Sequence, residues 1–105
     1  MPNKTTISPQ EAHQLMEQSK DVIVLDVRTP EEFKQVHIEG AKLLPVDEIS
    51  RRASKELTDK DAQILVYCKS GMRAGNAVRV LIGMGYTNVA SFGGIMEWPY
   101  KTVRG

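Results

Sequence analysis

Two uninterrupted hydrophobic runs stand out in the pattern of the chain, at residues 22–25 (VIVL) and 64–67 (ILVY). A continuous apolar run of this length is typical of a strand that is buried on both faces of a sheet. Shorter strand patterns occur at residues 5–7, 42–44 and 87–90. The pattern therefore predicts two central strands and three weaker ones.

Helical patterns separate these strands. Ser8 and Thr29 each stand directly before a proline, which is typical of a helix N-cap followed by the first helical residue. They predict one helix that begins at Pro9 and a short one that begins at Pro30. Residues 47–57 have a weaker helical pattern.

The spacing of apolar residues after the second buried strand predicts a longer helix. Ala74, Ala77, Val78 and Leu81 recur at intervals that place them on one helix face, and a final helical turn is expected at residues 95–98. The alternation of strands and helices is typical of an α/β domain with a mainly parallel sheet. Because ligands bind beyond the carboxyl ends of such strands, the candidate sites directly follow the two buried strands.

Length and composition fit one ordinary globular domain, which we expect to span residues 1–105. The 14 Lys and Arg residues nearly balance 13 Asp and Glu residues, for a net charge of +1, which argues against nucleic acid or an anionic membrane as a partner. No apolar run approaches the roughly 20 residues of a membrane span, and no apolar secretory segment follows the N-terminus. A cytoplasmic location is expected, since a lone thiol suits a reducing compartment.

Cysteine and histidine are too few for a metal site or a redox pair. Cys68 is the only cysteine, and His13 and His37 are the only histidines. A single cysteine excludes an internal disulfide and a CxxC motif, and this set of residues makes a poor zinc site. We expect neither a metal nor a cofactor.

The second buried strand leads into a segment that can carry chemistry, residues 68–73 (CKSGMR). A short loop at a helix N-terminus points backbone N–H groups at one spot, and the helix dipole adds positive potential there. Lys69 and Arg73 add two full positive charges. All these terms favour the thiolate form of Cys68, a nucleophile that needs no general base. The same loop can hold an anionic substrate or leaving group.

Several motifs together resemble the rhodanese family of sulfurtransferases, in particular its small single-domain members. The resemblance covers nearly the whole chain. It rests on LDVR at residues 25–28, EF at 32–33, HIEGA at 37–41, YCKSGMRA at 67–74 and the pair Gly93-Gly94 before Trp98. Each motif is weak alone, but their order and spacing together are specific.

The resemblance implies a three-layer fold with a central five-stranded, mainly parallel sheet flanked by helices. It also implies that Cys68 attacks a small anionic sulfur donor such as thiosulfate. The resulting persulfide passes its sulfur to cyanide, a thiol or a sulfur-accepting protein. Backbone N–H groups of the loop are expected to bind that persulfide, from Lys69, Ser70, Gly71, Met72 and Arg73.

Three further residues are expected to support the site rather than to react. Asp26 and Arg28 match the aspartate and arginine of the family motif, and we expect an ion pair or hydrogen-bond network that braces the active face. His37 is expected to make a structural hydrogen bond. The neighbouring pair Glu31-Glu32, by contrast, is expected to be a solvated face.

Loop length distinguishes sulfur transfer from phosphate chemistry. Four residues lie between Cys68 and Arg73, whereas phosphatases and arsenate reductases of this fold have five in a wider loop. Lys69 departs from the small, uncharged residues that mercaptopyruvate-using relatives favour, so the resemblance favours thiosulfate-like donors.

Other functions remain open from the sequence. The main alternative is a carrier module that receives a persulfide from a partner protein and passes it on, with little turnover of small donors. An inactive interaction domain and a phosphatase are opposed by the intact Cys68 and by the loop length, respectively.

Overall fold

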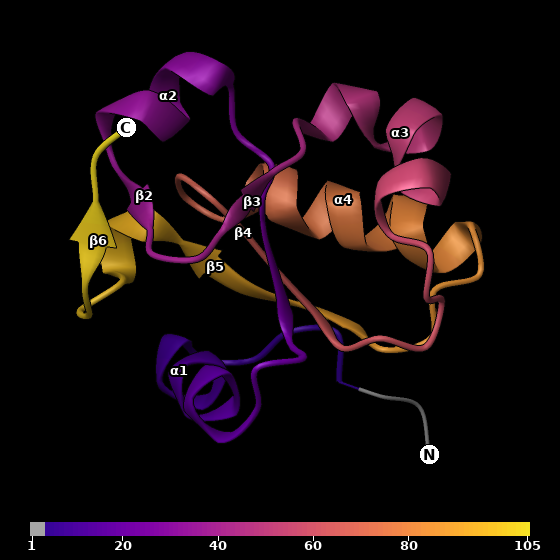
Figure 1. The fold of residues 1–105 in the computed structure, drawn as a ribbon, viewed down its shortest axis with the longest axis horizontal. Helices are drawn as coiled ribbons and strands as arrows, with labels where there is room; N and C mark the ends of the chain where they lie inside the picture. Colours follow the sequence, from indigo (N-terminus) through magenta and orange to yellow (C-terminus); the bar gives the residue numbers. More distant parts are fainter. Residues whose placement is uncertain (1–3) are drawn as a thin grey trace.

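Four parallel strands form the central sheet of the computed structural model, which describes residues 4–105 (Figure 1). From one edge to the other, the strand order is β3 (Lys42–Leu43), β1 (Ile23–Asp26), β4 (Ile64–Cys68) and β5 (Val89–Gly94). The two strongest hydrophobic runs therefore form the two inner strands, where both faces of a strand are covered. The expected α/β class with a mainly parallel sheet is confirmed.

The sheet has four strands where the family resemblance implied five. Residues 5–7 contribute only an isolated parallel bridge between Thr6 and Ser91, supported by the Ile7 N–H, which donates to the Ser91 carbonyl at 2.9 Å. Ser8 caps the first helix directly afterwards, so the segment has no length in which to form a regular strand.

A second, two-stranded antiparallel sheet was not expected. It pairs β2 (His37–Ile38) with β6 (Thr102–Val103). Strands of two residues are too short to show the alternation of apolar and polar residues by which a strand is recognised. The last parallel strand, β5, also begins later and extends further than the pattern at residues 87–90 indicated.

Capping boxes begin the first two helices, α1 (Pro9–Gln18) and α2 (Pro30–Gln35). Ser8 Oγ accepts a hydrogen bond from the Glu11 N–H at 3.0 Å, and the Glu11 carboxylate accepts one from the Ser8 N–H at 3.1 Å. Thr29 takes part in the same arrangement at the start of α2. Each box satisfies N–H groups that have no partner within the helix, and both predicted helix starts are confirmed.

The remaining helical segments are η1 (Val46–Glu48), α3 (Ile49–Glu56), α4 (Met72–Gly83) and η2 (Ile95–Glu97). The weak pattern at residues 47–57 thus divides into a 3-10 turn and a short α-helix. Within residues 4–105, no helix is both long enough and apolar enough to cross a membrane.

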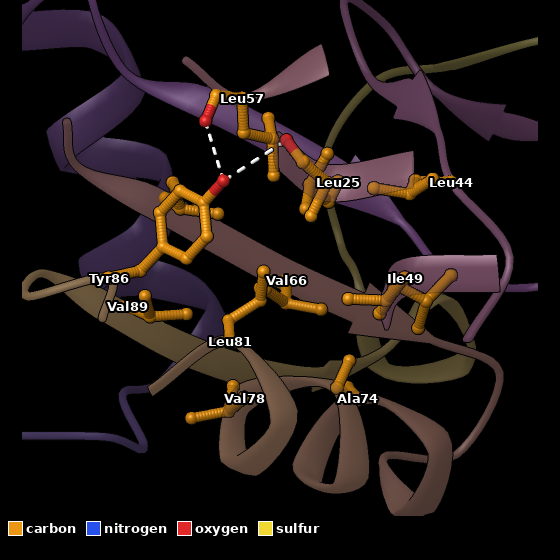
Figure 2. Close-up of a cluster of buried hydrophobic side chains, with 14 of the residues drawn as sticks. Leu25, Leu44, Ile49, Leu57, Val66, Ala74, Val78, Leu81, Tyr86 and Val89 are labelled. Carbon is orange, nitrogen blue, oxygen red and sulfur yellow. Dashed lines mark hydrogen bonds between the residues drawn. The ribbon is translucent and has the colours of Figure 1, made fainter. Parts of the chain in front are cut away.

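Helices on both faces of the sheet make three layers, with α3 and α4 on one side and α1 on the other (Figure 1). Alternate residues of β4 point to opposite faces. Ile64, Val66 and Cys68 join the hydrophobic cluster beneath α3 and α4, which Figure 2 shows, and Leu65 and Tyr67 join the cluster beneath α1. Cys68 therefore ends a strand that is fixed from both sides.

Tyr86 ties α3 to the cluster shown in Figure 2, since its buried hydroxyl lies 2.6 Å from the Leu57 carbonyl oxygen and 3.0 Å from that of Ala53. Tyr86→Phe leaves the Leu57 carbonyl without this donor, whereas the Ala53 carbonyl still accepts from the Leu57 N–H at 2.7 Å. We expect the variant to lower the free energy of unfolding by about 1–3 kcal/mol in urea titrations. Tyr100→Phe is the control, because the Tyr100 hydroxyl has no hydrogen bond within the described residues, and its effect should stay below about 0.5 kcal/mol. Equal losses in the two variants would contradict this assignment.

Candidate functional site

The two candidate segments meet at the carboxyl edge of the sheet. β1 and β4 are neighbours, and Asp26 lies opposite Tyr67 in their register. The Val27 N–H donates to the Tyr67 carbonyl at 3.1 Å and continues the pairing beyond the strand end. The loops that follow the two strands therefore leave the sheet side by side, as expected for a parallel sheet.

Cys68 lies at the base of the loop and is only 1% exposed. The Gly71 N–H donates to Cys68 Sγ at 2.9 Å. Gly71 has φ +116°, a left-handed conformation that side chains disfavour, and this turn directs its N–H back toward the sulfur. A thiolate accepts this hydrogen bond more strongly than a neutral thiol does.

Gly71 is also the N-cap of α4, and no side chain within residues 4–105 caps this helix. The first-turn N–H groups of a helix lack partners within the helix, and the helix dipole is positive at this end. The loop and the start of α4 therefore offer an anion site beside Sγ. That residues 68–73 bind a substrate or a persulfide stays a prediction.

The neighbouring strand β5 closes one side of the loop. The register between β4 and β5 shifts after Val66, so that Cys68 lies opposite Gly94. A Cβ atom at Gly94 would overlap the carbonyl group of Lys69 and would contact the Ser70 nitrogen at 2.6 Å. Only glycine fits at this position, because the loop backbone packs directly against the strand backbone. Gly94 belongs to the Gly93-Gly94 pair of the family motif, but the sequence pattern alone assigns this glycine no role.

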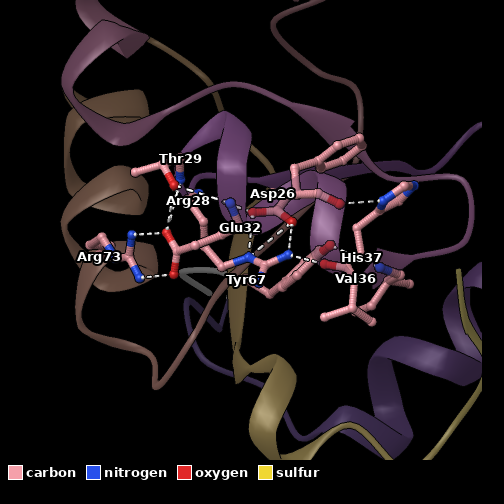
Figure 3. A network of polar contacts seen from close by, with 10 residues as sticks. Asp26, Arg28, Thr29, Glu32, Val36, His37, Tyr67 and Arg73 are labelled. Carbon is pink, nitrogen blue, oxygen red and sulfur yellow. Dashed lines mark hydrogen bonds and ion pairs between the residues drawn. The ribbon is translucent and has the colours of Figure 1, made fainter. Parts of the chain in front are cut away.

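Arg73 is held by a carboxylate from another helix (Figure 3). Its Nη1 and Nη2 donate to the two carboxylate oxygens of Glu32 at 2.8 and 3.0 Å, which joins α4 to α2. The hydrogen bond from Arg73 is the main cause that lowers the pKa of Glu32 to about 2, and the same bond raises the pKa of Arg73. The expectation that Glu32 belongs to a solvated face is wrong, because its carboxylate is paired with Arg73. The sequence pattern could not show this pair, since Arg73 lies 41 residues further along the chain.

Asp26 and Arg28 form the ion pair expected from the sequence (Figure 3). Arg28 Nη2 donates to Asp26 Oδ2 at 2.6 Å and Nε donates to Oδ1 at 2.9 Å. Nη2 also donates to the Val36 carbonyl at 2.6 Å. Both side chains are buried, at 0% and 3% exposed, so each charge depends on the other for compensation. The pair anchors the end of α2 to the end of β1.

Tyr67 and His37 lie in the same region of polar contacts (Figure 3). Burial raises the pKa of Tyr67, whose hydroxyl accepts a hydrogen bond from the Ile38 N–H at 3.0 Å. The His37 ring stacks on Phe33 with 3.7 Å between ring centroids, and its Nδ1 lies 2.9 Å from the Phe33 carbonyl oxygen. The expected structural hydrogen bond of His37 is present, and it ties β2 to α2.

Metal-ligating side chains do not gather within residues 4–105: no group of three or more His, Cys, Asp or Glu residues there is placed to hold an ion. A cavity of about 390 Å³ lies at the opposite end of the sheet from Cys68, where Val22, Ile23 and Gln63 line it near the starts of β1 and β4. It is separate from the candidate site.

The low pKa of Glu32 makes a pH-dependent contribution to stability. A depressed carboxyl pKa stabilises the fold above the ordinary value of 4.5, and this contribution is lost as the pH falls toward about 2. We expect Glu32→Gln to lower the free energy of unfolding at pH 7 by up to about 1 kcal/mol, since the pair is partly exposed. The difference from the unmodified protein should shrink at pH 3.

Glu31→Gln is the matched control, because Glu31 is the exposed neighbour and has no ion pair within the described residues. Urea titrations of all three proteins at both pH values measure the difference. A Glu32→Gln effect that is the same at pH 3 and pH 7 would show that the charge of Glu32 is not what stabilises the contact.

Comparison with known proteins agrees with the geometry. The family described as Rhodanese-like domain matches residues 8–100. The chain is 37% identical to thiosulfate sulfurtransferase PspE of Escherichia coli (strain K12), over 77% of this chain and 78% of that protein. It is 33% identical to YrkF of Bacillus subtilis (strain 168), whose name assigns it provisionally as a sulfur carrier protein, over 91% of this chain and 51% of that protein.

A solved structure described as rhodanese with anions from E. coli superimposes with a TM-score of 0.75 at 36% identity. The match covers 80% of this chain and 99% of that one. Sequence and fold therefore lead to the same assignment, and the chain belongs to the family of rhodanese-like domains.

Proposed function

We propose that this protein is a sulfurtransferase that moves a sulfur atom from thiosulfate, or a similar small anionic donor, to cyanide or a thiol through a persulfide on Cys68. The observation that carries the proposal is the Gly71 N–H, which donates to Cys68 Sγ at the start of α4, where no side chain of residues 4–105 caps the helix. The 37% identity to a thiosulfate sulfurtransferase supports thiosulfate as the donor.

In the first half-reaction, the Cys68 thiolate attacks the outer sulfur of thiosulfate. A new S–S bond forms to Sγ, the bond between the two donor sulfurs breaks, and its electron pair leaves with sulfite. The remaining negative charge rests on the outer sulfur of the persulfide. The donors that we expect to stabilise this charge directly follow Cys68 in the sequence. They are the backbone N–H groups of Lys69, Ser70, Gly71, Met72 and Arg73, and the helix dipole adds to their effect.

In the second half-reaction, cyanide or a thiolate attacks the outer sulfur. The S–S bond to Cys68 breaks, its electron pair returns to Sγ, and the thiolate is regenerated. The chain contains one cysteine, so it has no second thiol to accept the sulfur internally. The acceptor is external, and a reducing compartment such as the cytoplasm would supply thiols of this kind.

In our proposal, three residues support this site without contacting Sγ: Asp26, Arg28 and His37. Their hydrogen bonds join β1 and β2 to α2, and α2 presents Glu32 to Arg73. They are positioning residues, since their described contacts are with these elements and not with Sγ. No resident metal or cofactor is needed for either half-reaction.

A carrier module is the second candidate, and one observation favours it. Glu32 already compensates the charge of Arg73, which leaves Lys69 as the loop cation without a carboxylate partner within residues 4–105. A single uncompensated charge gives a weaker hold on a dianionic donor than two would give. Rapid transfer of one sulfur to Cys68, followed by very slow turnover with thiosulfate and cyanide, would favour the carrier.

The central experiment compares the unmodified protein with Cys68→Ser. Incubation with thiosulfate should add the mass of one sulfur to Cys68, and a reductant should remove it. Thiocyanate production from thiosulfate and cyanide should disappear in Cys68→Ser, because the serine hydroxyl is not ionised near neutral pH. If the unmodified protein gains no sulfur and instead cleaves an aryl phosphate through Cys68, it is a phosphatase and this proposal is wrong.

A second test addresses the packing of the loop on β5. Gly94→Ala places a Cβ atom against the Lys69 carbonyl and should displace the loop donors, which lowers kcat/KM for thiosulfate by about a hundredfold or more. Gly83→Ala is the control, because a Cβ atom at the end of α4 meets nothing within 4 Å, and its kcat/KM should stay within about twofold of the unmodified protein. Circular dichroism checks that both variants fold. Full activity in a folded Gly94→Ala would refute the role given to this contact.

A further inference from the structure

Two exposed methionines lie beside the loop that holds Cys68. Four large hydrophobic side chains are exposed within the described residues, and the two most exposed are Met72 at 80% and Met96 at 71%. Met72 follows Gly71 directly and begins α4. Met96 belongs to η2, and its N–H donates to the Lys69 carbonyl at 3.4 Å. Both thioether side chains therefore stand in water next to the candidate site.

A cation belongs to the same part of the molecule: Lys69 accepts the Met96 hydrogen bond through its carbonyl and lies three residues before Met72 in the loop. Lys69 is exposed and has no carboxylate within ion-pair distance among residues 4–105, whereas Arg73 is paired with Glu32. A carboxylate lies in the same region: Glu97 is exposed, and a Cβ atom at Gly93 would lie 3.6 Å from its Oε1. We call Met72, Met96 and Lys69 the methionine rim. It combines flexible apolar surface with one uncompensated positive charge.

The methionine rim is built from the loop that holds Cys68 and from the segment that packs on that loop. Cys68 is 1% exposed at the base of the loop, so a thiol that collects its sulfur has to reach past the surface around it. Cyanide and small hydrophilic thiols gain nothing from exposed thioether groups. A peptide segment gains by burying them, because methionine adapts to irregular apolar partners.

We infer that the methionine rim docks a segment of a sulfur-accepting protein in which apolar residues and a carboxylate flank the acceptor thiol. The apolar residues cover Met72 and Met96, and the carboxylate pairs with Lys69. This inference rests on the proposed function and names its acceptor by chemical class. The acceptor thiolate bonds to the outer persulfide sulfur, the S–S bond to Cys68 breaks with its electron pair returning to Sγ, and the negative charge of the persulfide stays on the transferred sulfur.

The test uses two synthetic peptides and cyanide as acceptors. One peptide is Ac-Leu-Glu-Cys-Leu-NH2, which matches the rim, and the other is Ac-Ser-Lys-Cys-Ser-NH2, which does not. Cys68 is loaded with thiosulfate, loading is verified by mass, and transfer rates are compared at equal concentrations of ionised thiol. We expect the matched peptide to accept sulfur with a kcat/KM about tenfold higher, from partial burial of apolar side chains and one ion pair.

The diagnostic variant is Met96→Gln, which keeps the length of the side chain and removes its apolar character. It should lower transfer to the matched peptide about fivefold and leave transfer to cyanide unchanged. Ile82→Gln is the control, because Ile82 is also exposed, at 46%, but lies in the last turns of α4 away from the loop. It should change neither rate.

Equal rates for the two peptides, or an equal loss for peptide and cyanide in Met96→Gln, would overturn the inference. Failure of the proposed function gives a different result, since thiosulfate would then add no sulfur to Cys68. In that case inorganic polysulfide is used to load Cys68, and the same peptide comparison tests the methionine rim independently of the donor. If polysulfide also leaves Cys68 unmodified, both the proposed function and this inference are wrong.

Discussion

The hydrogen bond from the Gly71 N–H to Cys68 Sγ depends on how tightly the loop is packed between a strand and a helix. Cys68 lies at the carboxyl end of β4, and the left-handed Gly71 turns the chain so that α4 begins four residues after the cysteine. Gly94 of β5 packs against the loop backbone at Lys69, so closely that only glycine fits at this position. The sulfur thus meets the oriented N–H group of Gly71 before any substrate binds, and such preorganisation favours negative charge at this point.

Two ion pairs beside this loop decide which of its neighbouring charges are already compensated. The buried Asp26–Arg28 pair fixes α2 against the sheet, and α2 in turn places Glu32 against Arg73. Two guanidinium groups near the carboxyl edge are therefore already compensated by carboxylates of the same chain. Lys69 has no carboxylate partner within residues 4–105, and the side chains of Met72 and Met96 are exposed in the same part of the molecule.

Local signals in the sequence predicted most of the fold, and contacts between distant residues account for what they missed. The buried strands and both capping boxes depend on neighbouring residues, so hydrophobic runs and cap motifs were sufficient. The antiparallel pair of two-residue strands has no such signal. The segment around Cys68 could be chosen as a candidate site because its residues are contiguous, and its role stays a prediction. The Glu32–Arg73 pair and the support from Gly94 join residues far apart in the chain, and residue type alone could not reveal them.

The most direct test of the account is a crystal structure of the protein after treatment with thiosulfate. The account predicts one additional sulfur atom bonded to Cys68 Sγ, directed into the loop and within about 3.5 Å of at least two backbone N–H groups of residues 69–73. It also predicts that the Asp26–Arg28 pair and the packing of the loop on Gly94 are unchanged. An unmodified Sγ after treatment, or an added sulfur that points away from the loop N–H groups, would contradict the central claim.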